Sequence, residues 1–256
     1  MTTYVGTAPK DQPQIVLTNK NYIINPTFSV NQRVFAGGSV TNGDYLFDRW
    51  NCRLNGAVSL PDASGFVTLS TFTTNGGLRQ KVEDFGYVGN VTVSWEGTSL
   101  LQYYDANSQV WSTPAASPVT FNMVAAGASE TDVAEQLLFG NGTLKNAKLE
   151  IDSVATPFEY PDTGTELTKC QRYYEKIEVY QFNGYASAGS NIGTEAYFKA
   201  TKRDIPVVVQ TNGGSTNASA TTNQLQVSTG GYMYYRTVTA LGEASFFESA
   251  TADAEL

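Results

Sequence analysis

Two prolines close together divide the chain into two parts. Before them, residues 148–152 (KLEID) alternate apolar and charged residues, which is the period of a strand with one buried face. Pro157 and Pro161 then each remove a backbone donor and push the preceding residue towards extended geometry. After them, a three- and four-residue spacing predicts a short amphipathic helix, capped by Thr163 or Thr165. The positions with this spacing are Leu167, Cys170, Gln171, Tyr174 and Ile177.

The composition favours an all-β protein on both sides of this junction. Only 16% of the 256 residues are charged, while aromatic residues reach 12% with Tyr in the lead, and Gly, Ser, Thr and Asn are abundant. This balance is typical of strands joined by many turns. The length allows two domains, and a hydrophobic share of 41% is enough to fill their cores.

The first part, residues 22–152, reads as about eight or nine short strands separated by turn signals, which is typical of a β-sandwich. Residues 45–54 alternate as a strand that buries Trp50, and Trp95 should also point inward. Residues 130–139 fit either a helical turn or a strand.

The second part reads as a smaller β unit that should sandwich the helix. Between its third and fourth strands, residues 211–223 (TNGGSTNASATTN) contain no apolar residue larger than Ala, which predicts an exposed loop. The predicted strands are 179–182, 195–199, 205–210, 225–228, 232–236 and 244–248.

The charge balance excludes several partners. A net charge of −8, with no basic cluster beyond Lys199, Lys202 and Arg203, argues against nucleic acid and anionic membranes. The chain has no apolar run long enough to span a bilayer, so we expect no membrane insertion. Its first residues lack the pattern of a signal peptide, so we expect synthesis in a cytosol. Cys52 and Cys170 are then expected to be free, buried thiols.

The absence of histidine removes most catalytic possibilities. Ser-His-Asp and Cys-His systems and His-ligated metal sites are excluded. The sequence also lacks a phosphate-binding loop and a dinucleotide fingerprint, so we predict no cofactor. Carboxylate chemistry remains, since a glycosidase needs only two acids across a sugar. Glu83, Asp84, Asp152 and Glu159 are generic candidates for such a pair, or they are solvated surface charges.

Sugar binding is the other remaining chemistry, because it needs an aromatic face with amides or carboxylates beside it. Two groups of residues offer this combination, although the first could instead pack at the sandwich edge and the second could contact nothing. The first comprises Tyr103, Tyr104, Asp105, Asn107 and Trp111. The second comprises the predicted loop 211–223 with Tyr232, Tyr234 and Tyr235.

Two ordered motifs resemble those of tail fibre and receptor-binding proteins of tailed bacteriophages and prophages. The first is NPTFSVNQR at 25–33, followed by YLFDRW at 45–50. The second is LE at 149–150 with ATPFEY at 155–160, followed by EL at 166–167 and CQRYYEK at 170–176. The chain departs from the pattern at Val34-Phe35, where a Gly is usual, and at Pro161-Asp162, in place of an Arg-rich stretch.

The resemblance implies an all-β chain with three parts. These are an attachment or neck segment at 1–20, a jelly roll similar to carbohydrate-binding modules at 21–160, and a second, smaller β-sandwich tip domain at 161–256 that begins with the short helix. It also implies a homotrimer, made in the bacterial host cytoplasm, that joins other virion proteins through its N-terminal segment. Asp48, in the DRW motif, should form a structural ion pair or a turn cap.

Three functions stay open at this point. The sequence favours a non-enzymatic virion fibre that attaches the particle to a bacterial surface glycan. The first alternative is a structural virion protein, such as a head fibre, decoration or baseplate component, without sugar binding. The second is a small polysaccharide depolymerase.

Overall fold

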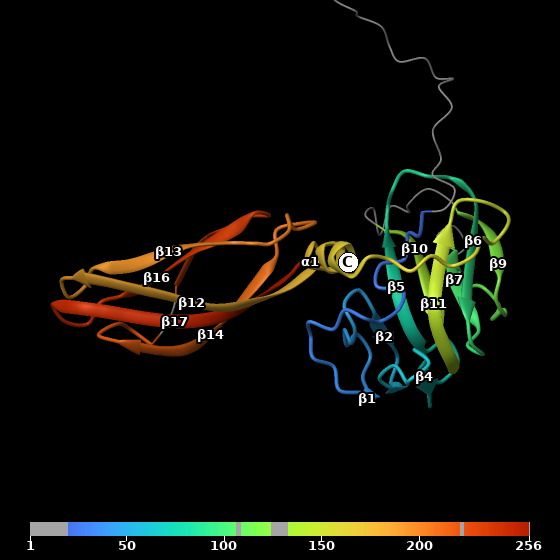
Figure 1. Ribbon diagram of the computed structural model, residues 1–256, viewed down its shortest axis with the longest axis horizontal. Coiled ribbons are helices and arrows are strands. Elements are labelled where there is room, and N and C mark those ends of the chain that lie inside the picture. Colours follow the sequence, from blue (N-terminus) through green and yellow to red (C-terminus); the bar gives the residue numbers. More distant parts are fainter. Residues whose placement is uncertain (1–19, 106–108, 124–132, 221–222, 256) are drawn as a thin grey trace, which may run out of the picture.

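The computed structural model describes residues 20–105, 109–123, 133–220 and 223–255. These residues form an all-β protein with one short helix, as predicted, in which a β-sandwich carries a second and smaller β region (Figure 1). The second region extends away from the sandwich as an arm (Figure 1). The expected N-terminal segment at 1–20 lies outside the described residues except for Lys20.

The sandwich consists of two antiparallel sheets. The six-stranded sheet has the order β1 (Gly38–Val40), β3 (Gly56–Val58), β4 (Val67–Ser70), β11 (Gly142–Glu150), β6 (Gly89–Glu96) and β9 (Val119–Met123). The five-stranded sheet has the order β2 (Asn51–Arg53), β5 (Gly77–Glu83), β10 (Val133–Phe139), β7 (Leu101–Asp105) and β8 (Val110–Trp111). Neighbours in each sheet are mostly distant in sequence, so the strands cross between the two layers.

The core between the sheets is built around aromatic rings. Trp50 and Trp95 are both buried, as predicted, and their rings lie 5.9 and 5.3 Å from the ring of Phe139. Cys52 and Cys170 are also buried and free, as expected. Since aromatic pairs at such distances add to the stabilisation from burial, these rings hold the two layers together.

The prediction of a continuous strand over residues 45–54 is wrong. The chain makes a tight turn there, in which the Trp50 amide donates to the Phe47 carbonyl at 2.9 Å, and only β2 is a strand. Arg49 has a φ of 72° and is buried instead of facing solvent. The Trp50 indole N–H donates to the Asn25 carbonyl at 2.8 Å, which anchors the turn to the first motif. Residues 130–139 were predicted as either a helical turn or a strand, and their described part forms the strand β10.

The helix α1 (Thr163–Gln171) forms where predicted, with two corrections. Its N-cap is Asp162, whose carboxylate accepts from the Thr165 amide at 2.9 Å, and the helix ends before Tyr174. Its inward side carries a buried glutamate as well as Cys170: Glu166 accepts from the Asn25 amide at 2.7 Å. The helix is therefore docked on the sandwich by a polar contact that the apolar spacing did not indicate.

The strand β11 differs from its prediction in a similar way, because both of its faces are buried. Lys148 and Glu150 form an ion pair at 3.1 Å with almost no exposure. The Thr156 amide donates to the Glu150 carboxylate at 2.8 Å, and Lys148 donates to the Pro157 carbonyl at 3.2 Å. The proline-containing exit thus folds back over the charged face and satisfies it.

The arm consists of two three-stranded antiparallel sheets. One has the order β12 (Tyr174–Ala186), β17 (Gly242–Asp253) and β14 (Val207–Thr216). The other has the order β13 (Asn191–Tyr197), β16 (Gly231–Thr237) and β15 (Asn223–Val227). The helix does not lie between these sheets, contrary to expectation, but at the base of the arm beside the sandwich (Figure 1). Tyr174 and Ile177, which were predicted to belong to the helix, belong to β12 instead.

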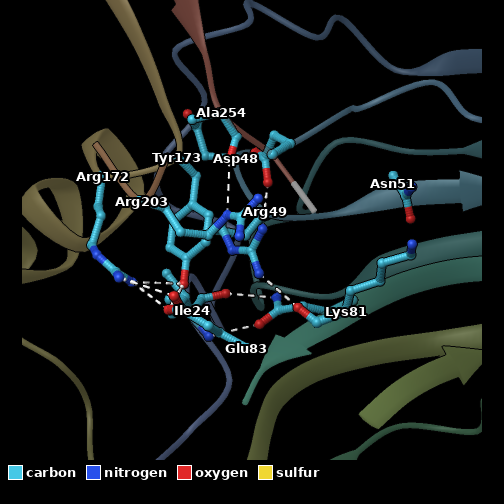
Figure 2. A network of polar contacts seen from close by, with 12 residues as sticks. Ile24, Asp48, Arg49, Asn51, Lys81, Glu83, Arg172, Tyr173, Arg203 and Ala254 are labelled. Carbon is cyan, nitrogen blue, oxygen red and sulfur yellow. Dashed lines mark hydrogen bonds and ion pairs between the residues drawn. The ribbon is translucent and has the colours of Figure 1, made fainter. Parts of the chain in front are cut away.

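A buried polar network joins the arm to the sandwich (Figure 2). Arg49 pairs with Glu255, donates to the Lys81 carbonyl at 2.6 Å, and lies over the Tyr173 ring at 3.6 Å. Tyr173 donates in turn to Glu83 at 2.6 Å. These contacts fix the base of the arm against the edge of the five-stranded sheet.

The first motif reaches the same junction through a glutamine. The Gln32 backbone and side-chain amides donate to the Asp48 carboxylate at 2.6 and 2.8 Å, and the side chain also donates to the Tyr174 carbonyl. Burial raises the pKa of Asp48, against the effect of these hydrogen bonds. Asp48 was predicted to form a structural ion pair or a turn cap. In the structure, its carboxylate accepts hydrogen bonds from Gln32.

Candidate functional site

The first group of predicted sugar-binding residues is split between the two faces of the five-stranded sheet. Tyr103 points inward and stacks on Phe121, with ring centroids 4.0 Å apart. Tyr104 and Trp111 are cross-strand partners with centroids 5.4 Å apart, and the Arg53 guanidinium lies 5.0 Å from the Trp111 ring. These contacts fit the alternative given in the sequence analysis, in which the aromatic residues of this group pack at the edge of the sandwich.

The two polar members of that group cannot be placed in a site. Asp105 belongs to β7, but its side chain is outside the described structure, as is the whole of Asn107. The amide beside the aromatic pair belongs to Gln102 instead, which donates to Asn75 and to the Ser112 carbonyl, both at 2.9 Å.

The alternation of buried and partly exposed residues in β16 changes the prediction for the second group. Tyr232 and Tyr234 are 3% and 1% exposed, because they point between the two sheets of the arm, and only Tyr235 lies on the outer face. Burial raises the pKa of both inward hydroxyls. Neither hydroxyl has a hydrogen-bond partner among the described residues. Tyr232 and Tyr234 therefore form part of the core, not of a receptor surface.

The predicted loop 211–223 is also corrected, since β14 continues through it to Thr216. Its two glycines support an aromatic ring. A Cβ on Gly213 would lie 2.4 Å from the ring of Phe247, and one on Gly214 would lie 2.8 Å from it. The ring of Phe247 therefore rests on bare backbone, with 42% of the residue exposed. This produces an aromatic platform on the outer face of the β12-β17-β14 sheet.

Buried charges hold the backbone under this platform. Arg236 and Glu248, both fully buried between the sheets, pair at 3.2 Å. Arg236 also donates to the Asn212 side-chain oxygen at 2.8 Å, and this oxygen accepts from the Gly214 amide at 2.9 Å. The register between β14 and β17 shifts at this point, between Asn212 and Gly214. The ion pair thus fixes the bulge that lets the Phe247 ring lie flat.

Polar side chains continue the outer face from the platform towards the far end of the arm. Cross-strand pairing places Asn183 opposite Ser245, and Tyr185 opposite Glu243. Together with Thr216 they line a hollow of about 440 Å³. Tyr185 is 72% exposed, so it offers a second aromatic face. We call the outer surface formed by Asn183, Tyr185, Thr216, Glu243, Ser245 and Phe247 the distal face.

The distal face has the chemistry that sugar recognition requires. An exposed ring accepts the apolar side of a pyranose, while amide, hydroxyl and carboxylate groups bind its hydroxyls. The sequence analysis missed Phe247 and Tyr185. The signal that could have found them is the NGG stretch at 212–214, which the sequence analysis includes in an exposed loop and does not connect with a large aromatic residue.

Three further findings concern a metal ion, a membrane and carboxylate catalysis. No group of three or more Cys, Asp and Glu side chains there lies close enough to hold a metal ion. Within the same ranges, no helix has the length and apolar content to cross a membrane. Glu83, a generic candidate for carboxylate catalysis, is engaged by Arg172 and Tyr173.

Comparisons with known proteins give a distant structural match. No family model matches the chain, and no curated protein does. Two solved structures of discoidin II from Dictyostelium discoideum, one of the recombinant and one of the wild-type protein, match with 10% identity and a TM-score of 0.25. Each match covers 88% of this chain. The match covers 97% of the recombinant discoidin II chain and 91% of the wild-type chain. At this TM-score the likeness says nothing about function, which has to rest on the residues described above.

Proposed function

We propose that this protein is a bacteriophage fibre or receptor-binding protein that attaches the virion to a glycan on the bacterial surface, through the distal face. It acts by adhesion and breaks no bond. The phage assignment rests on the motif resemblance, and the glycan assignment on the chemistry of the distal face.

One observation carries the glycan assignment: Phe247 lies flat and exposed over Gly213 and Gly214. A large apolar ring on an outer sheet face costs solubility, and here a buried ion pair maintains the backbone that presents it. Exposed rings with polar neighbours stack on sugar rings. Further along the same face, Asn183 and Tyr185 line the hollow and supply further contacts.

Weak binding at a single face becomes firm attachment when several copies act together. The resemblance implies a homotrimer, and an apolar stripe on the arm supports association between copies. Ile205, Val207 and Val209 are all exposed, and the last two lie on β14, an edge strand of its sheet. Exposed apolar residues on an edge strand are a common site of self-association.

Whole-cell adsorption and a glycan array test the proposal. We expect the protein to bind the authentic host or its isolated polysaccharide, and Phe247→Ala and Tyr185→Ala each to weaken binding at least about fivefold, as loss of a stacking ring does. Tyr160→Ala is the control, because Tyr160 is exposed to about the same degree as Tyr185 but lies on the sandwich side of the junction. Absence of binding to host and array, or equal binding by all three variants, would refute the proposal.

A structural virion component is the second candidate, and the stripe of Ile205, Val207 and Val209 favours it, because an apolar surface also serves assembly. Immunogold labelling of the virion and antibody blockade of adsorption separate the two functions. Antibodies should block adsorption if the distal face binds the host. A reducing-end assay on host polysaccharide should stay at background, whereas released sugar would indicate a depolymerase.

A further inference from the structure

The outer face of the other arm sheet holds a second hollow, of about 250 Å³, near the base of the arm. Pairing in this sheet arranges its side chains as two rows. In the first row, Met233 of β16 lies between Glu195 of β13 and Gln226 of β15. In the second row, Gly231 lies between Tyr197 and Ser228. Directly paired residues point to the same side of a sheet, so both rows face outward.

A glycine leaves the second row open at its centre. A Cβ on Gly231 would lie 2.5 Å from the Ala196 carbonyl oxygen, so this position excludes a side chain. The Ser228 amide and hydroxyl both bond to the Gly231 carbonyl, at 2.9 and 3.0 Å, which fixes the tight hairpin at this end. The floor of the hollow is therefore fixed backbone, with Tyr197, 70% exposed, as one wall.

The charge of this hollow comes from a single group. Glu195 is the one acidic or basic residue among those lining it. Its carboxylate accepts a hydrogen bond from the Tyr197 hydroxyl, and this hydrogen bond raises the pKa of Tyr197. The carboxylate thus lies beside the edge of an exposed aromatic ring and opposite the thioether of Met233.

These groups favour a positively charged ligand. An ammonium group is attracted to a carboxylate and to the face of an aromatic ring, and the net charge of −8 adds a long-range attraction. Gln226 supplies an amide for sugar hydroxyls, and the Ser228 hydroxyl oxygen, which donates to the Gly231 carbonyl and accepts from the Gly230 amide, keeps one acceptor site for them. The volume is below that of sites for drug-sized ligands, so it suits one sugar ring.

We propose that this hollow is a separate binding site for an amino sugar with a free, unacetylated amine. It shares no residue with the distal face. The Glu195 carboxylate binds the ammonium group, Tyr197 stacks against the ring, and Gln226 and Ser228 bind hydroxyls. An N-acetyl group removes the positive charge, so acetylated sugars bind less tightly.

The test compares a tetramer of β-1,4-linked glucosamine with its fully N-acetylated form, by calorimetry or NMR titration. The wild-type protein should prefer the free amine by about fivefold at low salt, and the preference should shrink as the salt concentration rises. Glu195→Gln should abolish the preference. Tyr197→Phe should retain it in part, because the ring remains.

Two further variants keep the result specific. Glu178→Gln removes an exposed carboxylate elsewhere on the arm and should change nothing. Phe247→Ala should also leave amine binding intact, so failure of the distal face and failure of this site are distinguishable. Thermal melts check that each variant folds. Absence of binding to either tetramer, equal binding of both, or an undiminished preference in Glu195→Gln would overturn the proposal.

Discussion

At the scale of single residues, the platform depends on the absence of a side chain. Gly213→Ala would place a methyl group where the Phe247 ring now lies, at 2.4 Å. We expect the ring to tilt away from the sheet, and glycan binding at the distal face to fall by up to about tenfold, with little change in melting temperature because Phe247 is already partly exposed.

The matched control for that substitution is Gly164→Ala in the first turn of α1, where a Cβ would meet its nearest atom, an Asp162 carboxylate oxygen, at 3.4 Å. This change should preserve binding, since alanine is favoured in helices. Unchanged binding by Gly213→Ala on the same array would show that the flat ring is not required.

At the scale of elements, the end of α1 is tied to β5 by an ion pair that makes stability depend on pH. Burial alone would raise the pKa of Glu83, but hydrogen bonds from Arg172 and Tyr173 outweigh it and hold the pKa below the ordinary value of 4.5. The folded state therefore binds this proton less readily than the unfolded chain. The stabilisation from Glu83 is fully present above about pH 4.5 and is lost as the pH falls through the lower, folded value.

Glu83→Gln should accordingly cost about 1 kcal/mol at pH 7, a modest value because both partners are partly exposed. The difference from wild type should shrink as the pH falls below 4.5, in denaturant titrations between pH 3 and 7. Glu178→Gln serves as the comparison, with no loss expected at any pH. A cost for Glu83→Gln that stays constant with pH would contradict the ion pair.

The elements also show what a sequence can and cannot predict. Strands such as β16 and β17 were predictable because period-two alternation is local, whereas the start of β12 was assigned to the helix and the end of β14 to a loop. The burial of Glu166 was not predictable, because its partner, the Asn25 amide, lies 141 residues away. Tyr232 and Tyr234 were misplaced because alternation shows that two residues share a face but not which face is inside.

At the scale of the whole molecule, residues 253–255 hold the arm to the sandwich. The Arg33 guanidinium contacts both Asp253 and Glu255 at 3.3 Å and lies 3.7 Å from the Tyr174 ring. Arg49, 2% exposed, pairs with the same Glu255, which is only 5% exposed. The sandwich and the arm are thus joined by charges that solvent barely reaches.

Removing one partner of such a pair is costly, because it leaves a buried charge uncompensated. We expect Glu255→Ala to cost about 3 kcal/mol and to uncouple the two regions, so that calorimetry resolves two unfolding transitions and X-ray scattering shows a wider range of arm positions. Adding Arg49→Met to this variant should recover part of the lost stability, because the double variant no longer buries an unpaired guanidinium at position 49. A single transition and a loss below about 1 kcal/mol in Glu255→Ala would mean that packing around Tyr173 and Tyr174, and not the charges, fixes the direction in which the arm presents the distal face.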